Sequence, residues 1–138
     1  MTVGRRTPRQ VAVIAVRRKA RDVEICLIRR RYSERWGVPK GFIDPGDTPE
    51  EAALTEADEE AGLLGEILGR SIGSYEYDKR GESLKVAVYV MLVADTRKRW
   101  SEMTFRERGW FALEEAARLL KRHPVAALWP RVVRELGG

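Results

Sequence analysis

One segment without a single Lys or Arg constrains the fold of this 138-residue chain more than any other feature. Residues 41–63 contain eight acids, namely Asp44, Asp47, Glu50, Glu51, Glu56, Asp58, Glu59 and Glu60. The other 13 of the 21 acids lie outside this segment together with all 26 basic residues, which leaves the rest of the chain at +13. The net charge of +5 therefore conceals an acidic segment set within a basic protein.

The acidic segment has the sequence of a loop that leads into a capped helix. Residues 41–48 contain two glycines, which permit a tight turn and a close approach of the backbone. Thr48 is a suitable N-cap, Pro49 suits the first helical position, and Glu51 completes a capping box with Thr48. Gly62 is a suitable C-terminal stop. The pattern predicts a helix over residues 49–61.

Three carboxylates share one face of this predicted helix. Glu56, Glu59 and Glu60 stand at positions i, i+3 and i+4, and no basic residue of the segment offsets their repulsion. A solvated acidic face is one interpretation of this spacing. The other is a site for Mg²⁺ or Mn²⁺, because these ions prefer carboxylate and water oxygens. The preceding loop and the cap favour the metal site.

The rest of the chain mixes strands and helices without strict alternation, which indicates one α+β domain, an α/β/α sandwich, over residues 1–138. Residues 1–8 form a candidate flexible segment. We expect a hairpin of residues 11–16 and 23–28, strands over 67–77, 84–94 and 109–113, and helices over 114–122 and 124–136. Residues 36–42 are expected to be irregular, and Pro130 is expected to kink the last helix.

Composition excludes several classes of protein. No apolar run approaches 18 residues, so no membrane-spanning helix and no membrane partner are expected. The single cysteine, Cys26, excludes an internal disulfide, lies in an apolar run, and is expected to be a buried thiol in a reducing compartment. The apolar stretch at residues 11–16 is too short for a signal peptide. We therefore expect a cytoplasmic protein.

The acidic segment also resembles a known motif. Residues 41–63 are similar to the Nudix box, G-x5-E-x7-R-E-U-x-E-E-x-G-U, in which U is an aliphatic residue. The matching residues are Gly41, Glu56, Ala57, Glu59, Glu60, Gly62 and Leu63. The resemblance implies a mixed sheet with flanking helices and the hydrolysis of a diphosphate linked to another group. It also implies a need for Mg²⁺ or Mn²⁺.

The resemblance assigns roles to the carboxylates. It makes Glu56 and Glu60 the best metal ligands, with the Gly41 carbonyl as a backbone ligand. Glu59 is either a third ligand or the general base, and Glu56 and Glu59 are the candidate catalytic residues. The implied reaction is attack of water on a phosphorus atom of a phosphoanhydride.

Two positions depart from the motif. Asp47 replaces the first Glu and keeps the carboxylate with a shorter reach, and Thr55 replaces the Arg. In the family this Arg pairs with motif carboxylates and holds them in place, so its loss predicts a more electronegative cluster. We expect Thr55→Arg to raise activity or to lower the metal requirement. The loss of this Arg also favours a second hypothesis, in which the chain binds or senses a nucleotide or polyphosphate with little turnover.

Basic residues outside the segment are the candidate phosphate ligands. Arg35 and Lys40 precede the motif directly, and Arg9 and Arg17 lie near the N-terminus. A looser resemblance, to the diphosphoinositol-polyphosphate and diadenosine-polyphosphate hydrolases, rests on short anchors. These are Arg35-Trp36, Trp100-Ser-Glu, the run from Arg106 to Phe111, and His123-Pro-Val. It adds Arg106 as a ligand of a highly phosphorylated small molecule.

Other features leave alternatives open. Hydrolysis at an RNA 5′ end is a third hypothesis, because a basic surface also attracts RNA, although aromatic and basic residues do not interleave clearly. His123, the one histidine, is expected to cap a helix or lie on the surface. Tyr75 and Tyr77 are either packed side chains or stacking partners of a base. The sequence allows a monomer or a homodimer.

Overall fold

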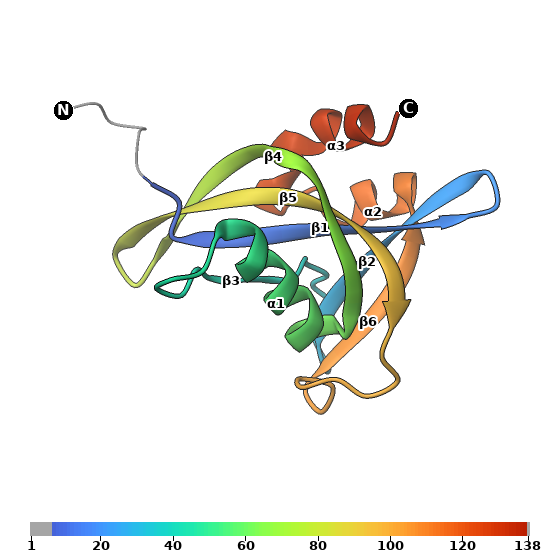
Figure 1. Ribbon diagram of the computed structural model, residues 1–138, viewed down its shortest axis with the longest axis horizontal. Helices are drawn as coiled ribbons and strands as arrows, with labels where there is room; N and C mark the ends of the chain where they lie inside the picture. The colour runs from blue at the N-terminus through green and yellow to red at the C-terminus, as the bar shows by residue number, and fades with distance from the viewer. Residues whose placement is uncertain (1–6, 138) are drawn as a thin grey trace.

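The computed structural model describes residues 7–137 (Figure 1). Its strands are β1 (Gln10–Lys19), β2 (Asp22–Arg30), β3 (Lys40–Phe42), β4 (Leu63–Lys79), β5 (Glu82–Thr96) and β6 (Arg106–Ala112). Its helices are α1 (Pro49–Ala61), α2 (Leu113–Leu119), the 3₁₀ helix η1 (Pro124–Leu128) and α3 (Trp129–Glu135). The segment predicted to be flexible, residues 1–8, falls mostly outside the described residues.

The strands form one mixed sheet in the order β4-β5-β1-β2-β6, with β3 paired to β1 beside β2. β1 and β5 are parallel, and the other pairs are antiparallel. β1 therefore carries two partners on one edge, because its first residues pair with β3 and its last residues pair with β2. In this register Lys40 lies opposite Ala12 and Gly41 lies opposite Val11. The start of the acidic segment is thus fixed against the central strand.

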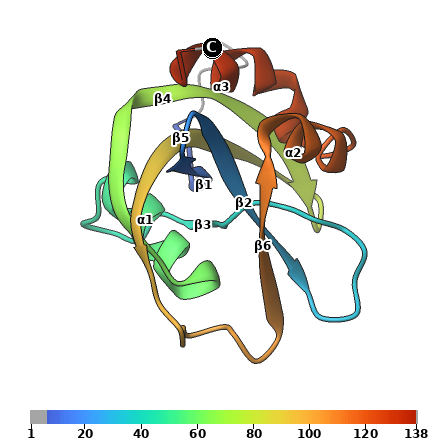
Figure 2. The ribbon, with the colours of Figure 1, turned by 90° about the vertical axis from the view of Figure 1, so that its right-hand side faces the viewer.

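Alternation along β1 divides the core into two layers. Ala12, Ile14 and Val16 face one layer, and the residues between them face the other. Figure 2 shows α1 on one side of the sheet and α2 and α3 on the other. The side of α1 that packs on the sheet is built of small residues, which are Ala52, Ala53, Ala57 and Ala61. These alanines bring the helix backbone close to the strands, and the arrangement confirms the predicted α+β class.

The caps of α1 form as the sequence predicts. The Thr48 hydroxyl accepts from the Glu51 N–H at 3.1 Å, and the Glu51 carboxylate accepts from the Thr48 N–H at 2.8 Å. Gly62 ends the helix with a φ of 65°, a left-handed conformation that favours glycine. Because both ends are set by local chemistry, the predicted bounds of 49–61 agree with the structure.

Two predictions about local structure are wrong. Residues 40–42 are a short strand rather than irregular, because β1 extends far enough to offer them a free edge. The last predicted helix divides into η1 and α3, and Pro130 lies in the first turn of α3 instead of kinking one long helix. Proline is favoured there because the first N–H groups of a helix have no partner within it. None of the helices in the described part of the chain is long and apolar enough to cross a membrane.

Candidate active site

Gly41 and Glu56 approach each other where β3 meets α1. A Cβ atom built on Gly41 would overlap the Glu56 carboxyl group, so no side chain fits at this position without a shift. The β1–β3 pairing holds Gly41, and the alanine face holds α1, so neither partner can withdraw easily. The structure thus explains why a glycine begins the motif.

Glu60 is the most enclosed carboxylate of the cluster, at 7% exposure. The Lys40 N–H donates to its Oε1 at 3.0 Å, and Nη2 of Arg106 lies 3.7 Å from its Oε2. Burial raises the pKa of Glu60, and the Lys40 N–H and the Arg106 charge oppose that rise. Both oxygens of Glu60 are therefore held in place from outside the helix.

Glu56 is half-buried beside Glu60. Burial, and then repulsion from Glu60 and Glu59, raise the pKa of Glu56 to about 8. Two carboxylates in this position repel each other strongly once both are ionised. A cation bound between them would remove that repulsion, so the electrostatics fit a positive ligand.

The donors at this position are oxygen atoms, which suits Mg²⁺ or Mn²⁺. Within residues 7–137, no three Asp, Glu, His or Cys side chains are arranged as a ready-made cage. Mg²⁺ does not require one, because it is commonly bound by one or two carboxylates and keeps water and phosphate as its other ligands. Glu56 and Glu60 fit this type of site.

Glu59 is the solvent-exposed carboxylate of the three. It is exposed and lines a shallow pocket together with Asp58, Arg97, Arg99, Trp100 and Ser101. The three carboxylates thus share one side of α1 as predicted, but Glu59 lies on the solvent side of the cluster. That position suits a group that exchanges protons with water.

The two positions that depart from the motif lie on the surface. Thr55 is exposed and lines a pocket with Leu54, Asp58 and Leu63. Asp47 is exposed in the turn before α1, where its N–H donates to the Asp44 carbonyl at 3.0 Å. In this structure the cation beside the buried carboxylate is Arg106, which comes from β6.

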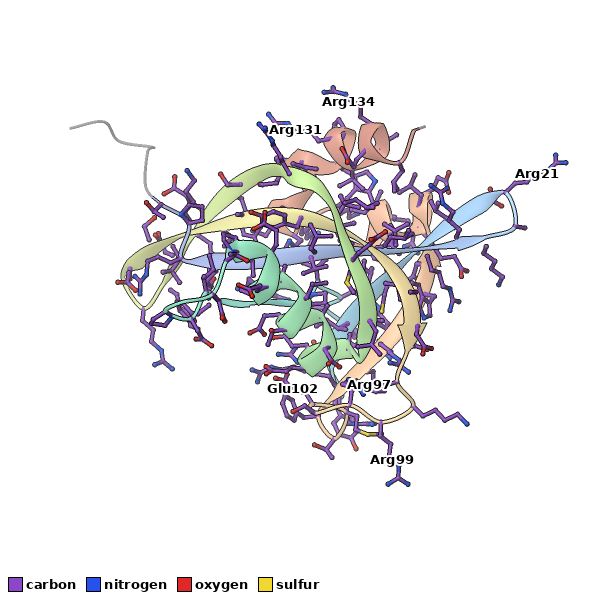
Figure 3. All side chains as sticks on the ribbon, viewed as in Figure 1. Arg21, Arg97, Arg99, Glu102, Arg131 and Arg134 are labelled. Carbon is purple, nitrogen blue, oxygen red and sulfur yellow. The ribbon has the colours of Figure 1, made fainter. Side chains whose placement is uncertain are left out.

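The C-terminal end of α1 is held by a segment that the sequence did not connect to it. The last three carbonyl groups of α1 and that of its C-cap, Gly62, each accept a hydrogen bond from residues 97–108. The Glu59 carbonyl accepts from the Glu102 N–H at 3.0 Å and the Glu60 carbonyl from Trp100 Nε1 at 3.0 Å. The Ala61 carbonyl accepts from Arg108 Nη1 at 2.6 Å and the Gly62 carbonyl from the Arg97 N–H at 2.8 Å. Figure 3 shows Arg97 and Glu102 below the end of α1. We name residues 97–108 the helix clamp. The Trp100-Ser-Glu anchor and the start of the anchor from Arg106 to Phe111 lie in it, but neither indicated a contact with α1.

Lys40 begins a polar chain that the sequence also did not predict. Its Nζ donates to the Tyr77 hydroxyl at 2.8 Å, and that hydroxyl donates to Gln10 Oε1 at 2.7 Å. Lys40 thus touches Glu60 through its backbone and β4 through its side chain. Tyr75 and Tyr77 pack against the core layer that faces α2 and α3, which confirms the packed interpretation.

The other predicted phosphate ligands are scattered. Arg35 is exposed and lines a pocket with the residues around His123. Arg9 pairs with Glu82 at 2.9 Å, near β3. Arg17 pairs with Glu24 at 2.8 Å and stacks on Trp110, at the opposite end of β1. Six residues separate Arg17 from the position opposite Gly41, or about 20 Å of strand, so the structure does not bring Arg17 to the cluster.

Two predictions about single residues are confirmed. His123 is the N-cap of η1, where its Nδ1 accepts from the Val125 N–H at 3.0 Å. Cys26 is fully buried, and burial raises the pKa of its thiol to about 12. Neither side chain joins the carboxylate cluster.

Comparisons with known proteins relate this chain to a family. The NUDIX domain family model matches residues 6–131. Diphosphoinositol polyphosphate phosphohydrolase 3-beta of Bos taurus is 33% identical over 133 residues, which cover 94% of this chain and 79% of that protein. The 3-alpha enzyme of Mus musculus is 32% identical with the same coverage. A crystal structure of a C. elegans Ap4A hydrolase binary complex has a TM-score of 0.76 at 23% identity and covers 96% of this chain and 99% of that chain.

Proposed function

The chain belongs to the Nudix family, and from this we propose that it is a metal-dependent hydrolase of a phosphoanhydride bond in a multiply phosphorylated small molecule. The observation that carries the proposal is the enclosed pair Glu56 and Glu60, held against Gly41 and the Lys40 N–H. Two neighbouring acids of like charge, one of them buried, are costly to maintain for folding alone. A cation bound between the two carboxylates would offset this cost and give the pair a function.

We assign Glu56, Glu60 and the Gly41 carbonyl as the groups that hold the ion. Bound Mg²⁺ or Mn²⁺ would lower the pKa of the attacking water and neutralise phosphate oxygens. The protein groups do the rest. Glu59, on the solvent side, accepts the proton of the water, and Glu56 is the alternative base. The water oxygen forms a bond to phosphorus, the bridging oxygen leaves with its electron pair, and it is protonated from solvent.

Cations around the cluster would bind the rest of the substrate. Arg106 contacts Glu60 with its guanidinium, whereas Lys40 contacts Glu60 with its backbone N–H and its ammonium group lies 2.8 Å from the Tyr77 hydroxyl. Arg35, in the pocket around His123, and Arg9, paired with Glu82, are further candidates, and Arg17 is the weakest because of its distance. The names of the relatives suggest two substrates, a diphosphoinositol polyphosphate and a diadenosine polyphosphate. The +13 charge outside the acidic segment suits either polyanion.

A substrate panel with product identification tests the proposal. Purified protein with Mg²⁺ or Mn²⁺ is given diphosphoinositol polyphosphates, diadenosine polyphosphates, nucleoside triphosphates, ADP-ribose and a capped or triphosphorylated oligonucleotide. We expect phosphate or nucleotide release from at least one of the first two, abolished by EDTA. No release from any of them would refute the proposal, and preference for the oligonucleotide would favour RNA 5′-end hydrolysis instead.

The exposed Thr55 favours a second candidate function, which is binding without efficient turnover. Tight binding of a polyphosphate, with turnover that Glu59→Gln leaves unchanged, would support a sensing role. A fall in turnover in Glu59→Gln with binding preserved would support the enzyme.

A further inference from the structure

The carboxylate helix has no counter-charge of its own. No basic residue lies in the last turn of α1, and the position at which the motif has Arg is occupied by the exposed Thr55. Glu60 is nevertheless almost fully enclosed, beside a second carboxylate. An enclosed anion without a nearby cation is destabilising, so the charge has to come from another element.

Arg106 at the start of β6 is that cation. Its Nη2 lies 3.7 Å from Glu60 Oε2, and its Nε donates to Glu102 Oε1 at 2.5 Å. Its side chain is only 19% exposed, so solvent screens the contact with Glu60 weakly. Glu102 fixes the guanidinium from the other side, because a planar fork with one nitrogen held loses freedom at the others. The Glu102 carboxylate also raises the pKa of Glu60, but by less than the Arg106 charge lowers it, so Arg106 still favours the ionised form of Glu60.

The helix clamp sets the distance between Arg106 and α1. The same segment that carries Arg106 donates to the last three carbonyl groups of the helix and to that of its C-cap. Arg31 ties this segment to β2, because its guanidinium donates to the carbonyls of Met103 and Thr104 at 3.0 and 2.9 Å. Arg106 therefore cannot move independently of Glu60.

We infer that Arg106 is a positioning residue. From β6 it supplies the positive charge that the motif Arg would supply at the position of Thr55, and the helix clamp holds its guanidinium beside Glu60. The inference rests on the proposed site, since it concerns how that site is held together. It predicts that Thr55→Arg adds little to a cluster that already has its cation. This expectation differs from the one based on the motif alone, in which Thr55→Arg raises activity.

Thermal unfolding without substrate tests the inference. Arg106→Gln is compared with the wild type in EDTA and in saturating Mn²⁺, with Arg106→Lys as the conservative variant. The matched control is Arg134→Gln, because Arg134 is exposed on α3, on the opposite side of the molecule from Glu102 (Figure 3). In EDTA we expect Arg106→Gln to lower the Tm by about 3–8 °C, Arg106→Lys by less, and the control to leave it unchanged.

The metal supplies the distinguishing readout. Mn²⁺ would replace the missing positive charge beside Glu60, so its stabilising shift should be larger in Arg106→Gln than in the wild type. An equal shift in both proteins would mean that Arg106 is an ordinary structural contact, and a Tm equal to the Arg134→Gln control in EDTA would also overturn the inference.

A double variant separates this inference from the proposed function. Thr55→Arg should change the Tm of the wild type in EDTA by less than it changes that of Arg106→Gln, where it should recover part of the loss. Equal effects in both backgrounds would contradict the replacement. The Tm comparisons in EDTA need neither metal nor turnover. They therefore test the role of Arg106 even if the protein hydrolyses no substrate of the panel.

Discussion

Gly41 is the residue at which the backbone and the acidic cluster meet most closely. Its lack of a side chain lets the Glu56 carboxyl group lie directly against β3. The position needs a glycine for space alone, because Gly41 is absent from the residues with positive φ. The absence of a Cβ atom at Gly41 therefore matters both for the packing of β3 against α1 and for the position of a proposed metal ligand.

We predict that Gly41→Ala displaces the Glu56 carboxylate and lowers turnover at least tenfold. We also expect it to lower the free energy of unfolding by about 1–3 kcal/mol, because an added methyl group in a packed site forces neighbours to shift. Gly37→Ala is the matched control, since its nearest neighbours lie 3.9 Å from the added carbon, which is ordinary contact. If Gly41→Ala is as active as Gly37→Ala, the close approach of Gly41 and Glu56 has no functional role.

His123 gives a pH dependence with a defined sign. Burial, followed by the nearby Lys40 charge, lowers the pKa of His123 to about 4, and the ring also meets the edge of Tyr75. The folded state thus binds fewer protons than the unfolded state between pH 6.5 and 4. The neutral ring stabilises the fold above pH 6.5, and this contribution is lost as the pH falls towards 4.

We expect the loss to be on the order of 1–2 kcal/mol after allowance for the exposed part of the ring. His123→Asn keeps a side chain that can cap η1 but removes the titrating group. Its free energy of unfolding, measured by denaturant titration at several pH values, should fall less steeply from pH 6.5 to 4 than that of the wild type. Parallel curves for the two proteins would show that His123 is not the group responsible.

At the scale of elements, α1 was predictable and its surroundings were not. Thr48, Glu51 and Gly62 define its ends through contacts with near neighbours in the chain, so the sequence alone located both boundaries. The helix clamp depends on donors about 40 residues away, and no periodicity reveals which segment will reach a helix end. β3 was missed for a similar reason, because three residues form a strand only when another strand offers an edge.

The candidate site divides in the same way. The motif located Glu56, Glu59 and Glu60 on one helix, and the structure brings Lys40 and Arg106 to Glu60. The sequence could not show that Arg17 lies far from the cluster along β1, because that distance can be estimated only once the pairing partner of Gly41 is known.

The clamp itself can be tested through Arg108. Its guanidinium donates to the carbonyls of Ala61 and Arg97, both at 2.6 Å, and stacks 4.0 Å from the ring of Trp100. We predict that Arg108→Gln lowers the free energy of unfolding by about 1–3 kcal/mol, because it leaves a helix-end carbonyl without its donor. Hydrogen exchange should speed up in the last turn of α1 before other helices.

Arg118→Gln is the control for this change. Arg118 forms an exposed pair with Glu115 on α2, and such a pair contributes about 0–1 kcal/mol. Equal effects of the two substitutions on unfolding and on exchange in α1 would mean that the clamp does not hold the helix end.

At the scale of the whole molecule, the charge division seen in the sequence becomes a spatial arrangement. The acidic segment forms most of β3, the turn after it and α1, and Arg9, Lys40, Arg106 and the basic residues of the clamp form a rim near it. A negative cluster proposed to bind a cation, with a positive rim beside it, would attract polyanions from solution. Screening by salt should weaken that attraction.

We therefore predict that kcat/KM for a polyphosphate substrate falls roughly tenfold or more between 50 and 300 mM monovalent salt, with kcat changed much less. Steady-state kinetics over this range, at constant free Mg²⁺, provides the measurement. A salt-independent kcat/KM would contradict a role for the basic rim in capturing substrate.

We propose above all that the Glu56 and Glu60 carboxylates of α1 support a metal-dependent hydrolysis. The most direct test is Mg²⁺-dependent product release from the best substrate of the panel, measured side by side for the wild type, Glu56→Gln, Glu60→Gln and Glu50→Gln. Glu50 is an exposed acid in the first turn of the same helix and so serves as the control. We predict that Glu56→Gln and Glu60→Gln lose about 10²–10⁴-fold in kcat while Glu50→Gln stays near the wild type. Equal activity in all four proteins would contradict it.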